Sequence, residues 1–200
     1  MDKPVVGSGL LQRGRRAALG GVAGHRVWRL PADVDTEALA PGRWMKYGAE
    51  VIARHCLESL RPQFALQARP GDVIVAGANF GIGSSREQAA SALVHLGIVA
   101  VVAPSYGGLF YRNAFSVGLP LLICRDAEAI ADGETVSFDL ERGIVRCVAD
   151  AAGQQLRGPQ FSCDPIPPFL LAMVRAGGLL PQLKRRLHRP AGDAPSVART

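Results

Sequence analysis

The stretch Val73-Ile-Val-Ala-Gly-Ala-Asn-Phe-Gly-Ile-Gly-Ser-Ser-Arg-Glu-Gln-Ala89 decides the fold of this chain. An apolar run of strand length, residues 73–76, ends in a glycine-rich turn, and Ser84-Ser-Arg-Glu87 then opens a helical pattern. A helix N-terminus presents unpaired backbone N–H groups and the positive end of the helix dipole, which favours anions. Arg86 adds a planar guanidinium that can bind a carboxylate or phosphate through two hydrogen bonds. The stretch therefore predicts a strand, a turn and a helix, with a small acid bound beside a serine.

Apolar patterns elsewhere predict that strands and helices alternate. On the N-terminal side we expect a strand over residues 26–30 and a helix over residues 49–60. On the C-terminal side the expected elements are helices over residues 85–96, 109–117, 169–176 and 179–187, buried strands over 98–103 and 119–124, and an antiparallel hairpin over 134–140 and 144–149. Apolar strands that alternate with helices favour the α/β class, with a mixed, largely parallel sheet flanked by helices.

Size and composition are those of one globular domain. The chain has 200 residues, of which 48% are hydrophobic and 20% are charged, so it can bury a core and is not of the disordered class. It contains no apolar run of the roughly 18 residues that cross a bilayer, and no secretory signal. We divide it into a flexible basic leader (1–23), a domain (24–188) and a disordered tail (189–200). We expect a cytoplasmic protein without a membrane partner.

The net charge of +6 is carried by the two ends of the chain. Lysine and arginine outnumber the acids within residues 1–22 and 184–200, and the body between these segments is nearly neutral. Basic ends of this kind are usually solvated, so we expect no nucleic-acid partner.

The cysteines lie far apart in the sequence, at Cys56, Cys124, Cys147 and Cys163. No two of them have the close spacing of zinc or iron–sulfur ligands. Cys56 falls on the apolar side of a helical pattern and Cys124 ends an apolar run, so both are expected to be buried small hydrophobes. We therefore expect this chain to hold no metal of its own.

The serine motif allows a structural and a functional interpretation. Ser84 and Glu87 have the spacing of a capping box, in which the serine would only satisfy backbone N–H groups of the helix. A nucleotide P-loop is excluded because no lysine follows the glycines, and a dinucleotide fingerprint fails on glycine spacing. The histidines are scattered and neither serine lies in a G-x-S-x-G elbow, so a Ser-His-acid hydrolase is not indicated. A helix cap and a carboxylate-binding site both stay open.

The loop Gly42-Arg-Trp-Met-Lys-Tyr-Gly48 combines two aromatic and two cationic side chains. It could be a surface loop anchored by Trp44. It could also be a lid over an anionic ligand, since aromatic rings exclude water and Lys46 supplies charge. Asp33, Asp35 and Glu37 precede this loop, and acids in such a turn usually cap helices or stay solvated.

Together these landmarks resemble the swivelling domain of the aconitase superfamily. The similarity is carried by Asn79-Phe-Gly-Ile-Gly-Ser-Ser-Arg-Glu-Gln-Ala89 and by the segments Asp33-Val-Asp-Thr-Glu37, Ala40-Pro-Gly-Arg43, Arg69-Pro-Gly-Asp-Val-Ile-Val-Ala-Gly77, Ala103-Pro-Ser-Tyr106, Phe110-Tyr-Arg-Asn113, Gly118-Leu-Pro120 and Ala176-Gly-Gly-Leu179. It covers residues 24–188. A free-standing domain of this length is most similar to the small subunits of 3-isopropylmalate dehydratase and homoaconitase. The resemblance implies a swivelling β/β/α fold.

The resemblance also implies a hydro-lyase with two kinds of subunit, which isomerises a 2-hydroxy polycarboxylic acid by dehydration and rehydration. This chain would need no cofactor of its own, because in the family a separate large subunit carries a [4Fe–4S] cluster that binds the substrate. Ser84 matches the general base of the family. The residues implied in substrate binding are Ser85, Arg86, Lys46, Trp44 and Thr36.

Some positions depart from the family pattern: Glu37 replaces the usual Asp, Ile82 a frequent Cys, and Gln88 a frequent His. In the loop that matches the specificity loop of the family, Lys46 suits a distal carboxylate, whereas Met45 and Tyr47 suit an apolar branch such as isopropyl. We favour 3-isopropylmalate and leucine biosynthesis, and the alternative is homoaconitase or an aconitase-like enzyme. A non-enzymatic regulatory or RNA-binding relative that uses the basic ends is the alternative of another class.

Overall fold

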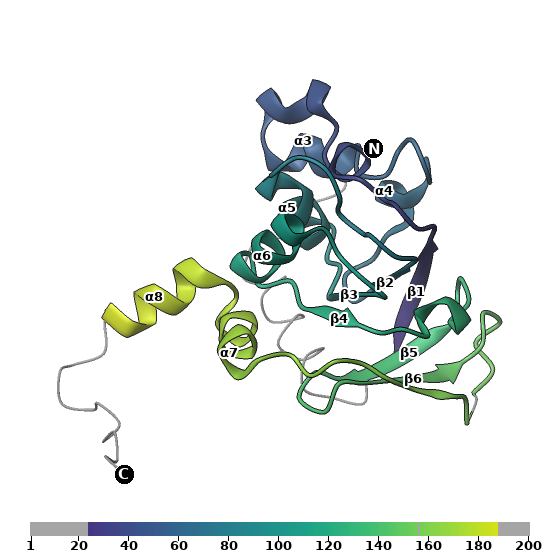
Figure 1. The fold of residues 1–200 in the computed structure, drawn as a ribbon. Helices are drawn as coiled ribbons and strands as arrows, with labels where there is room; N and C mark the ends of the chain where they lie inside the picture. Colours follow the sequence, from purple (N-terminus) through teal and green to yellow (C-terminus); the bar gives the residue numbers. More distant parts are fainter. Residues whose placement is uncertain (1–23, 156, 188–200) are drawn as a thin grey trace, which may run out of the picture.

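A computed structural model describes residues 24–155 and 157–187 of the chain (Figure 1). Its helices are α2 (Thr36–Leu39), η1 (Gly42–Tyr47), α3 (Ala49–Arg54), α4 (Phe64–Gln67), α5 (Glu87–His95), α6 (Gly108–Ser116), η2 (Ala127–Ala129), α7 (Pro168–Ala176) and α8 (Leu179–Leu187). Its strands are β1 (His25–Leu30), β2 (Val73–Ala76), β3 (Ala100–Ala103), β4 (Leu121–Ile123), β5 (Thr135–Asp139), β6 (Ile144–Ala149) and β7 (Gln160–Ser162). The expected leader, residues 1–23, and the expected tail, residues 189–200, lie outside the described residues.

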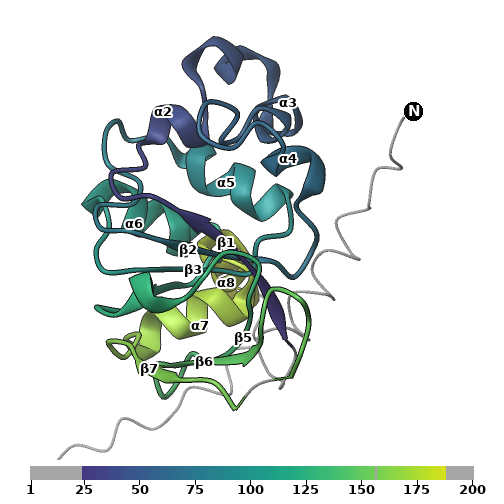
Figure 2. The same cartoon turned by 90° about the vertical axis from the view of Figure 1, so that its right-hand side faces the viewer.

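The strands form one seven-stranded sheet in the order β4-β3-β2-β1-β5-β6-β7. Strands β1 to β4 are parallel, and β5 to β7 continue the sheet in antiparallel pairs from β1. All residues of β2 and β3 are buried, as expected for central parallel strands that are covered on both faces. Helices α3, α5 and α6 lie on one side of these strands, and the antiparallel strands curve below them (Figures 1 and 2). The predicted α/β fold with a mixed sheet flanked by helices is confirmed.

The chain returns to the far edge of the sheet after β7. The N–H of Asp164 donates to the carbonyl of Ile123 at 2.8 Å, which brings the end of β7 beside β4. The curled sheet and its helices enclose a core whose largest buried side chains include Phe64, Phe80 and Phe110. Burial of this apolar surface is the main term that stabilises the domain.

The segment 49–60, which the sequence pattern predicts to be one helix, is helical only in its first half. Helix α3 ends at Arg54, and Leu57 has a left-handed backbone with φ of 59°. The N–H of Leu57 donates to the carbonyl of Ala38 at 2.7 Å. A right-handed helix does not continue through a left-handed residue, so the expectation of one continuous helix is wrong. Residues 42–47, expected as a loop, form the 3₁₀ helix η1.

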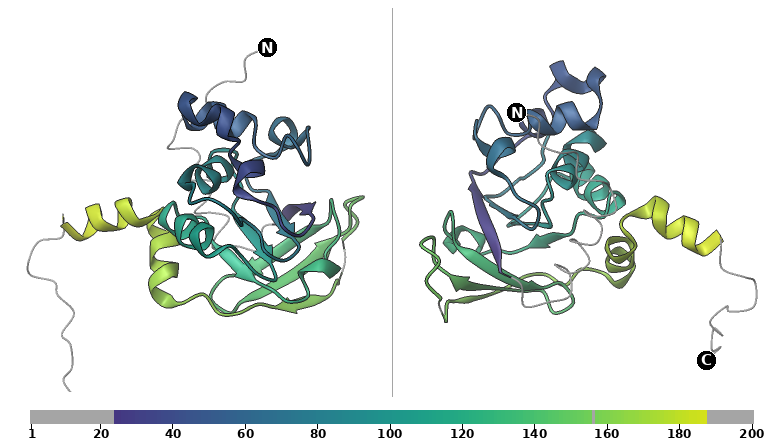
Figure 3. Two further views of the ribbon diagram at one scale, coloured as in Figure 1. Left: turned by 45° about the horizontal axis from the view of Figure 1, so that its top comes forward. Right: turned by 180° about the vertical axis from the view of Figure 1, so that it is seen from behind.

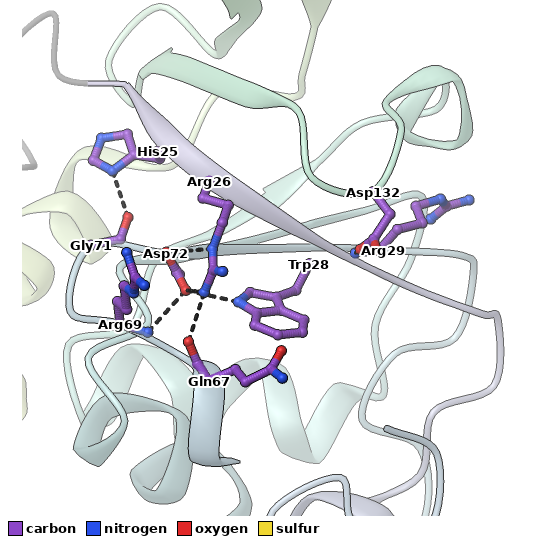
Figure 4. A network of polar contacts seen from close by, with 9 residues as sticks. All are labelled: His25, Arg26, Trp28, Arg29, Gln67, Arg69, Gly71, Asp72 and Asp132. Carbon is purple, nitrogen blue, oxygen red and sulfur yellow. Dashed lines mark hydrogen bonds and ion pairs between the residues drawn. The ribbon is translucent and has the colours of Figure 1, made fainter. Parts of the chain in front are cut away.

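A buried carboxylate organises the edge of the sheet where the parallel strands begin (Figure 4). Asp72 accepts hydrogen bonds from Nη2 of Arg26 at 2.6 Å, Nε1 of Trp28 at 2.8 Å and the backbone N–H of Arg69 at 2.9 Å. The guanidinium groups of Arg26 and Arg61 lie over the Trp28 ring, 4.7 Å and 5.1 Å from its centroid. A buried carboxylate with this many donors is fully satisfied. The network fastens β1 to the turn that precedes β2.

Helices α7 and α8 end the described chain, and their positions confirm the helices expected over residues 169–176 and 179–187. Helix α7 contacts α6, and α8 extends from the body as an arm (Figures 1 and 3). Within the described ranges, no helix is long and apolar enough to cross a membrane. Cys56 and Cys124 are buried as expected, and burial raises the pKa of the Cys56 thiol.

Candidate active site

Three loops meet at the edge where the parallel strands end: residues 31–35, 77–86 and 104–107. We call residues 77–86 the serine turn. The N–H of Gly81 donates to the carbonyl of Val34 at 2.6 Å, and the N–H of Phe80 donates to the carbonyl of Ser105 at 3.1 Å. The serine turn is therefore held between the other two loops. Ligands of open α/β sheets bind at this edge, so Ser84 lies where a ligand site is expected.

Two glycines give the serine turn its shape. The φ angle is 77° at Gly81 and 105° at Gly83, values that favour glycine, as expected from the sequence. A Cβ at Gly81 would lie 2.2 Å from Cγ of Phe110, and a Cβ at Gly83 would lie 3.0 Å from Oγ1 of Thr36. Thr36 is itself buried. The absence of side chains at these two positions lets the turn pack closely against Phe110 and Thr36.

The hydroxyl of Ser84 is exposed and does not cap helix α5. The helix begins at Glu87, its N-cap residue is Arg86, and no side chain caps it. Instead the carbonyl of Ser84 accepts a hydrogen bond from the N–H of Arg86 at 2.8 Å. The capping-box interpretation is therefore wrong, and the helix starts two residues later than expected. Ser84 and Ser85 are both exposed, and neither hydroxyl is bonded to another of the described residues.

The guanidinium of Arg86 is held through one of its two terminal nitrogens. Its Nη1 donates to the carbonyl of Ala40 at 2.9 Å and pairs with the carboxylate of Glu37. Glu37 also accepts a hydrogen bond from the N–H of Gly42 at 2.8 Å. The Gly42 N–H and the Arg86 guanidinium hold the pKa of Glu37 below its usual range. Within the described ranges Nη2 of Arg86 makes no hydrogen bond, so its N–H donors are not used by the fold, and binding of a carboxylate would need such donors.

The 3₁₀ helix η1 rests on the chain after α3 through Trp44. The indole of Trp44 stacks on the imidazole of His55, with ring centroids 3.9 Å apart. Glu58 lies 2.7 Å from Nδ1 of His55 and pairs with Arg43. Burial raises the pKa of Glu58, but the hydrogen bonds from His55 and Arg43 outweigh burial, and the pKa is lowered. Trp44 therefore anchors the segment that contains it.

Lys46 and Tyr47 lie at the exposed end of η1. Nζ of Lys46 is 5.0 Å from the centroid of the Tyr47 ring, and Tyr47 is 52% exposed. Lys46 forms no ion pair with another described residue, so its charge is available to a ligand. Glu37 connects η1 to the serine turn, because its carboxylate binds both Gly42 and Arg86.

The predicted site residues fall into two groups. Residues 84–86 and Thr36 lie together at the serine turn. Trp44 and Lys46 lie on η1, and no hydrogen bond within the described ranges joins either side chain to the serine turn. The assignment of all these residues to catalysis and substrate binding stays a prediction.

Asn79 and Ser105 received no role from the sequence, although both lie at this edge. Nδ2 of Asn79 donates to Oδ1 of Asp33 at 2.8 Å, and the hydroxyl of Ser105 donates to Oδ1 of Asn79 at 3.2 Å. Asn79 has a left-handed backbone, with φ of 60°. An asparagine inside a glycine-rich turn is a weak signal of such a backbone, but its partners come from loops far away in the sequence.

The arrangement suits the binding of an organic anion beside an unengaged hydroxyl. Arg86 and Lys46 supply positive charge, and Ser84 and Ser85 supply hydroxyls that can donate or accept. Among residues 24–155 and 157–187, no three His, Cys, Asp or Glu side chains are placed to hold a metal ion.

Known proteins are similar to this chain in both sequence and fold. Residues 57–125, which include the serine turn, match the family model of the aconitase C-terminal domain. The chain is 42% identical over 162 residues to the methanogen homoaconitase small subunit of Methanothermobacter thermautotrophicus, a match that covers 80% of this chain and 89% of the relative. It is 38% identical to the 3-isopropylmalate dehydratase small subunit 1 of Archaeoglobus fulgidus, over 78% of this chain and 92% of the relative.

A solved structure agrees with these sequence matches. The crystal structure of 3-isopropylmalate dehydratase from Methanocaldococcus jannaschii superposes with a TM-score of 0.73 and 36% sequence identity. The match covers 82% of this chain and 94% of that structure.

Proposed function

This chain belongs to the family of 3-isopropylmalate dehydratase and homoaconitase small subunits, and from that premise we propose that it works with a large subunit to isomerise a 2-hydroxy polycarboxylic acid by dehydration and rehydration. The observation that carries the proposal is that Ser84 is exposed, does not cap the helix, and lies two residues before Arg86 in a turn closed by the hydrogen bond from the Arg86 N–H to the Ser84 carbonyl. The hydroxyl of Ser84 is thus one that a substrate on another subunit can reach.

Ser84 is proposed as the general base that removes a proton from the carbon beside a substrate carboxylate. A serine hydroxyl is a weak base, so its alkoxide needs positive charge nearby and exclusion of water. Arg86 supplies charge, although its pairing with Glu37 offsets part of it. Ser84 is open to solvent in this chain alone, so water must be excluded by a docked partner. We therefore expect no isomerase activity from the isolated chain.

Arg86, Ser85 and Thr36 are proposed to hold a substrate carboxylate. Nη1 of Arg86 is occupied by Ala40 and Glu37, which restrains the guanidinium and leaves Nη2 as the donor for the ligand. A guanidinium group that is already held in position loses less conformational entropy when it binds a carboxylate. The hydroxyl of Ser85 adds a donor one residue away.

The second subunit is proposed to carry the [4Fe–4S] cluster of the reaction. The relatives are named small subunits, which supports a heteromeric enzyme. The cysteines of this chain are buried in the fold, and within residues 24–155 and 157–187 no three His, Cys, Asp or Glu side chains are grouped to hold a metal ion. When bound, the cluster of the partner would supply a Lewis acid for the departing hydroxyl group. We also place the enzyme in the cytoplasm, which cell fractionation would test.

The substrate is proposed to be 3-isopropylmalate, in the biosynthesis of leucine. Met45 and Tyr47 of η1 offer apolar surface to an isopropyl branch, and the relative from Archaeoglobus fulgidus carries that activity in its name. Homoaconitase is the second candidate, because Lys46 could pair with a distal carboxylate and the relative from Methanothermobacter thermautotrophicus is named for that activity.

The proposal is tested by reconstituting the chain anaerobically with the cluster-bearing large subunit of the same organism. We expect isomerase activity only from the mixture, sensitive to oxygen, with the highest kcat/KM on 3-isopropylmalate among 3-isopropylmalate, homocitrate and citrate. A preference for homocitrate would select the second candidate. No activity of the mixture on any of the three acids would contradict the proposed function.

A further inference from the structure

Asn79 links all three loops at the edge where the parallel strands end. Its Nδ2 donates to Asp33 in the loop after β1 at 2.8 Å. Its Oδ1 accepts from the hydroxyl of Ser105, in the loop after β3, at 3.2 Å. Its backbone N–H donates to the same Ser105 oxygen at 2.8 Å. The side chain of one residue in the serine turn thus binds both neighbouring loops.

The backbone at this link is unusual on both sides. Asn79 and Asp33 are left-handed, with φ of 60° and 58°. Asparagine and aspartate are the residues besides glycine that adopt this conformation most readily, and each such residue must be held by its surroundings. The N–H of Asp33 donates to the carbonyl of Ala78 at 2.8 Å, so backbone and side chain join the same two loops.

We propose that Asn79 is a positioning residue that sets the place of Ser84, and this inference rests on the proposed function of Ser84 as a base. Four residues separate Asn79 from Ser84 along the serine turn. Between them, Gly81 is bonded to Val34 and Gly83 packs on Thr36. The loop that Asn79 holds through Asp33 is also the loop that supplies Val34 and leads into Thr36, so a loosened link at Asn79 shifts the support of residues 81–84.

The link should affect turnover more than substrate binding. Arg86 has its own anchors in Ala40 and Glu37, which do not involve Asn79. A carboxylate held by Arg86 would therefore stay in place while Ser84 moves. Since a displacement of about 1 Å in a reacting group can cost roughly a hundredfold in rate, we expect changes at Asn79 to lower kcat and to leave KM nearly constant.

An exchange of the two side chains tests the link without changing the net charge. Asn79→Asp places two carboxylates face to face and removes the donor to Asp33. In the double variant Asp33→Asn with Asn79→Asp, the amide at position 33 can donate to the carboxylate at position 79, and Ser105 keeps its acceptor. Asparagine and aspartate both tolerate the left-handed backbone. We expect N79D to lower kcat roughly 10–100-fold and the double variant to return to within about threefold of the wild type.

Asn79→Gly isolates the effect of losing the side-chain hydrogen bonds from any effect of the backbone angle or of added charge. Glycine accepts the left-handed φ at no steric cost, adds no charge and removes both side-chain bonds. We expect N79G to lower kcat by about tenfold or more with KM within about threefold, since no carboxylate pair is created. The single variant D33N serves as the matched control, because an amide oxygen at position 33 can still accept from Asn79.

The kcat and KM of each variant are measured in the reconstituted pair. All variants are compared at the same concentration of folded chain, and the folded fraction of each is taken from its cooperative melting transition. A double variant as slow as N79D would overturn the proposal. So would a normal kcat for N79G, or a rise in KM with kcat unchanged, since that result would place Asn79 in binding.

Amide hydrogen exchange of the isolated chain separates this inference from the proposed function. We expect faster exchange over residues 77–86 in N79D and restored protection in the double variant. Equal protection in all variants would overturn the link even if the pair is active. An inactive wild-type pair would contradict the proposed function, and the exchange measurement would still decide whether Asn79 holds the turn.

Discussion

The two edges of the parallel strands hold their polar groups in opposite ways. Where the strands begin, Asp72 is 5% exposed and accepts bonds from Arg26, Trp28 and Arg69 at 2.6–2.9 Å (Figure 4). Where the strands end, the hydroxyls of Ser84 and Ser85 are exposed and bonded to no other described residue. The first edge uses its polar groups within the fold, and the second leaves some of them for a ligand.

The backbones differ in the same sense. The edge of Ser84 contains two left-handed residues that are not glycine, Asp33 and Asn79, and conformations of that kind cluster at functional sites. A site that leaves hydrogen-bond donors unpaired and holds residues in unfavourable backbone conformations must be stabilised by other parts of the molecule. The Asp72 network and the buried central strands are the parts of this fold that can provide it.

The largest expected effect on stability comes from breaking the satisfied edge. Asp72→Ala leaves the buried N–H of Trp28 and the charge of Arg26 without their acceptor, and we expect it to lower the free energy of unfolding by about 3 kcal/mol. In a domain of this size that corresponds to a fall in Tm of roughly 6–12 °C. Thermal melting followed by circular dichroism measures it.

The matched control is Asp126→Ala, which removes an exposed carboxylate and should change stability by less than about 0.5 kcal/mol. A Tm of D72A equal to that of D126A would contradict the structural role of the first edge. The kcat of folded D72A, assayed in the reconstituted pair, should stay near that of the wild type.

A smaller effect, on KM, is expected from Arg86→Lys at the other edge. A lysine carries one compact charge and cannot bind Ala40, Glu37 and a substrate carboxylate at once. Loss of a charged hydrogen bond of about 1.5–3 kcal/mol raises KM roughly 10–100-fold. Arg54→Lys is the control, because its exposed pair with Glu50 tolerates either cation. An unchanged KM of R86K would show that Arg86 does not hold the substrate.

The comparison of the two edges also shows what the sequence could predict. Strand β2, the serine turn and helix α5 follow from local apolar patterns and glycine spacing, so the sequence predicts them. The start of α5 at Glu87 could not be predicted from the sequence, because the N–H of Arg86 donates to the carbonyl of Ser84 before the helix begins. The end of α3 could not be predicted either, since the backbone of Leu57 is fixed by a hydrogen bond to the carbonyl of Ala38.

The site residues show the same limit. Ser84 and Arg86 belong to one motif and could be predicted together. The pairing of Arg86 with Glu37 joins residues 49 positions apart, and the bonds of Asn79 reach Asp33 and Ser105, 46 and 26 positions away. Such contacts depend on the sheet order, which a single sequence does not specify. The boundaries of the leader and the tail stay predictions.

The smallest expected effect is the pH dependence of stability that arises from Glu37. Its pKa is lowered in the folded chain by the Gly42 N–H and Arg86, so the carboxylate stabilises the fold above its unfolded pKa of about 4.3 and loses that contribution as the pH falls through the lowered value. Because the Glu37 side chain is 57% exposed, the contribution is below about 1 kcal/mol.

Glu37→Gln should therefore make the unfolding free energy fall less steeply with acid below about pH 4.3 than in the wild type. Urea titrations at a series of pH values measure the difference. Glu128→Gln, at an exposed position of η2, should leave the wild-type slope unchanged. Identical slopes for E37Q and the wild type would mean that the ion pair with Arg86 does not form in solution.

The role of Ser84 as the base is tested most sharply by the kcat of Ser84→Ala in the reconstituted enzyme, compared with that of Ser85→Ala. We expect S84A to lower kcat by roughly 10²–10⁴-fold without changing Tm, because the exposed hydroxyl makes no bond to the described residues. S85A should mainly raise KM. A near-normal kcat for S84A in a pair that is active with the wild-type chain would contradict the claim that Ser84 is the base.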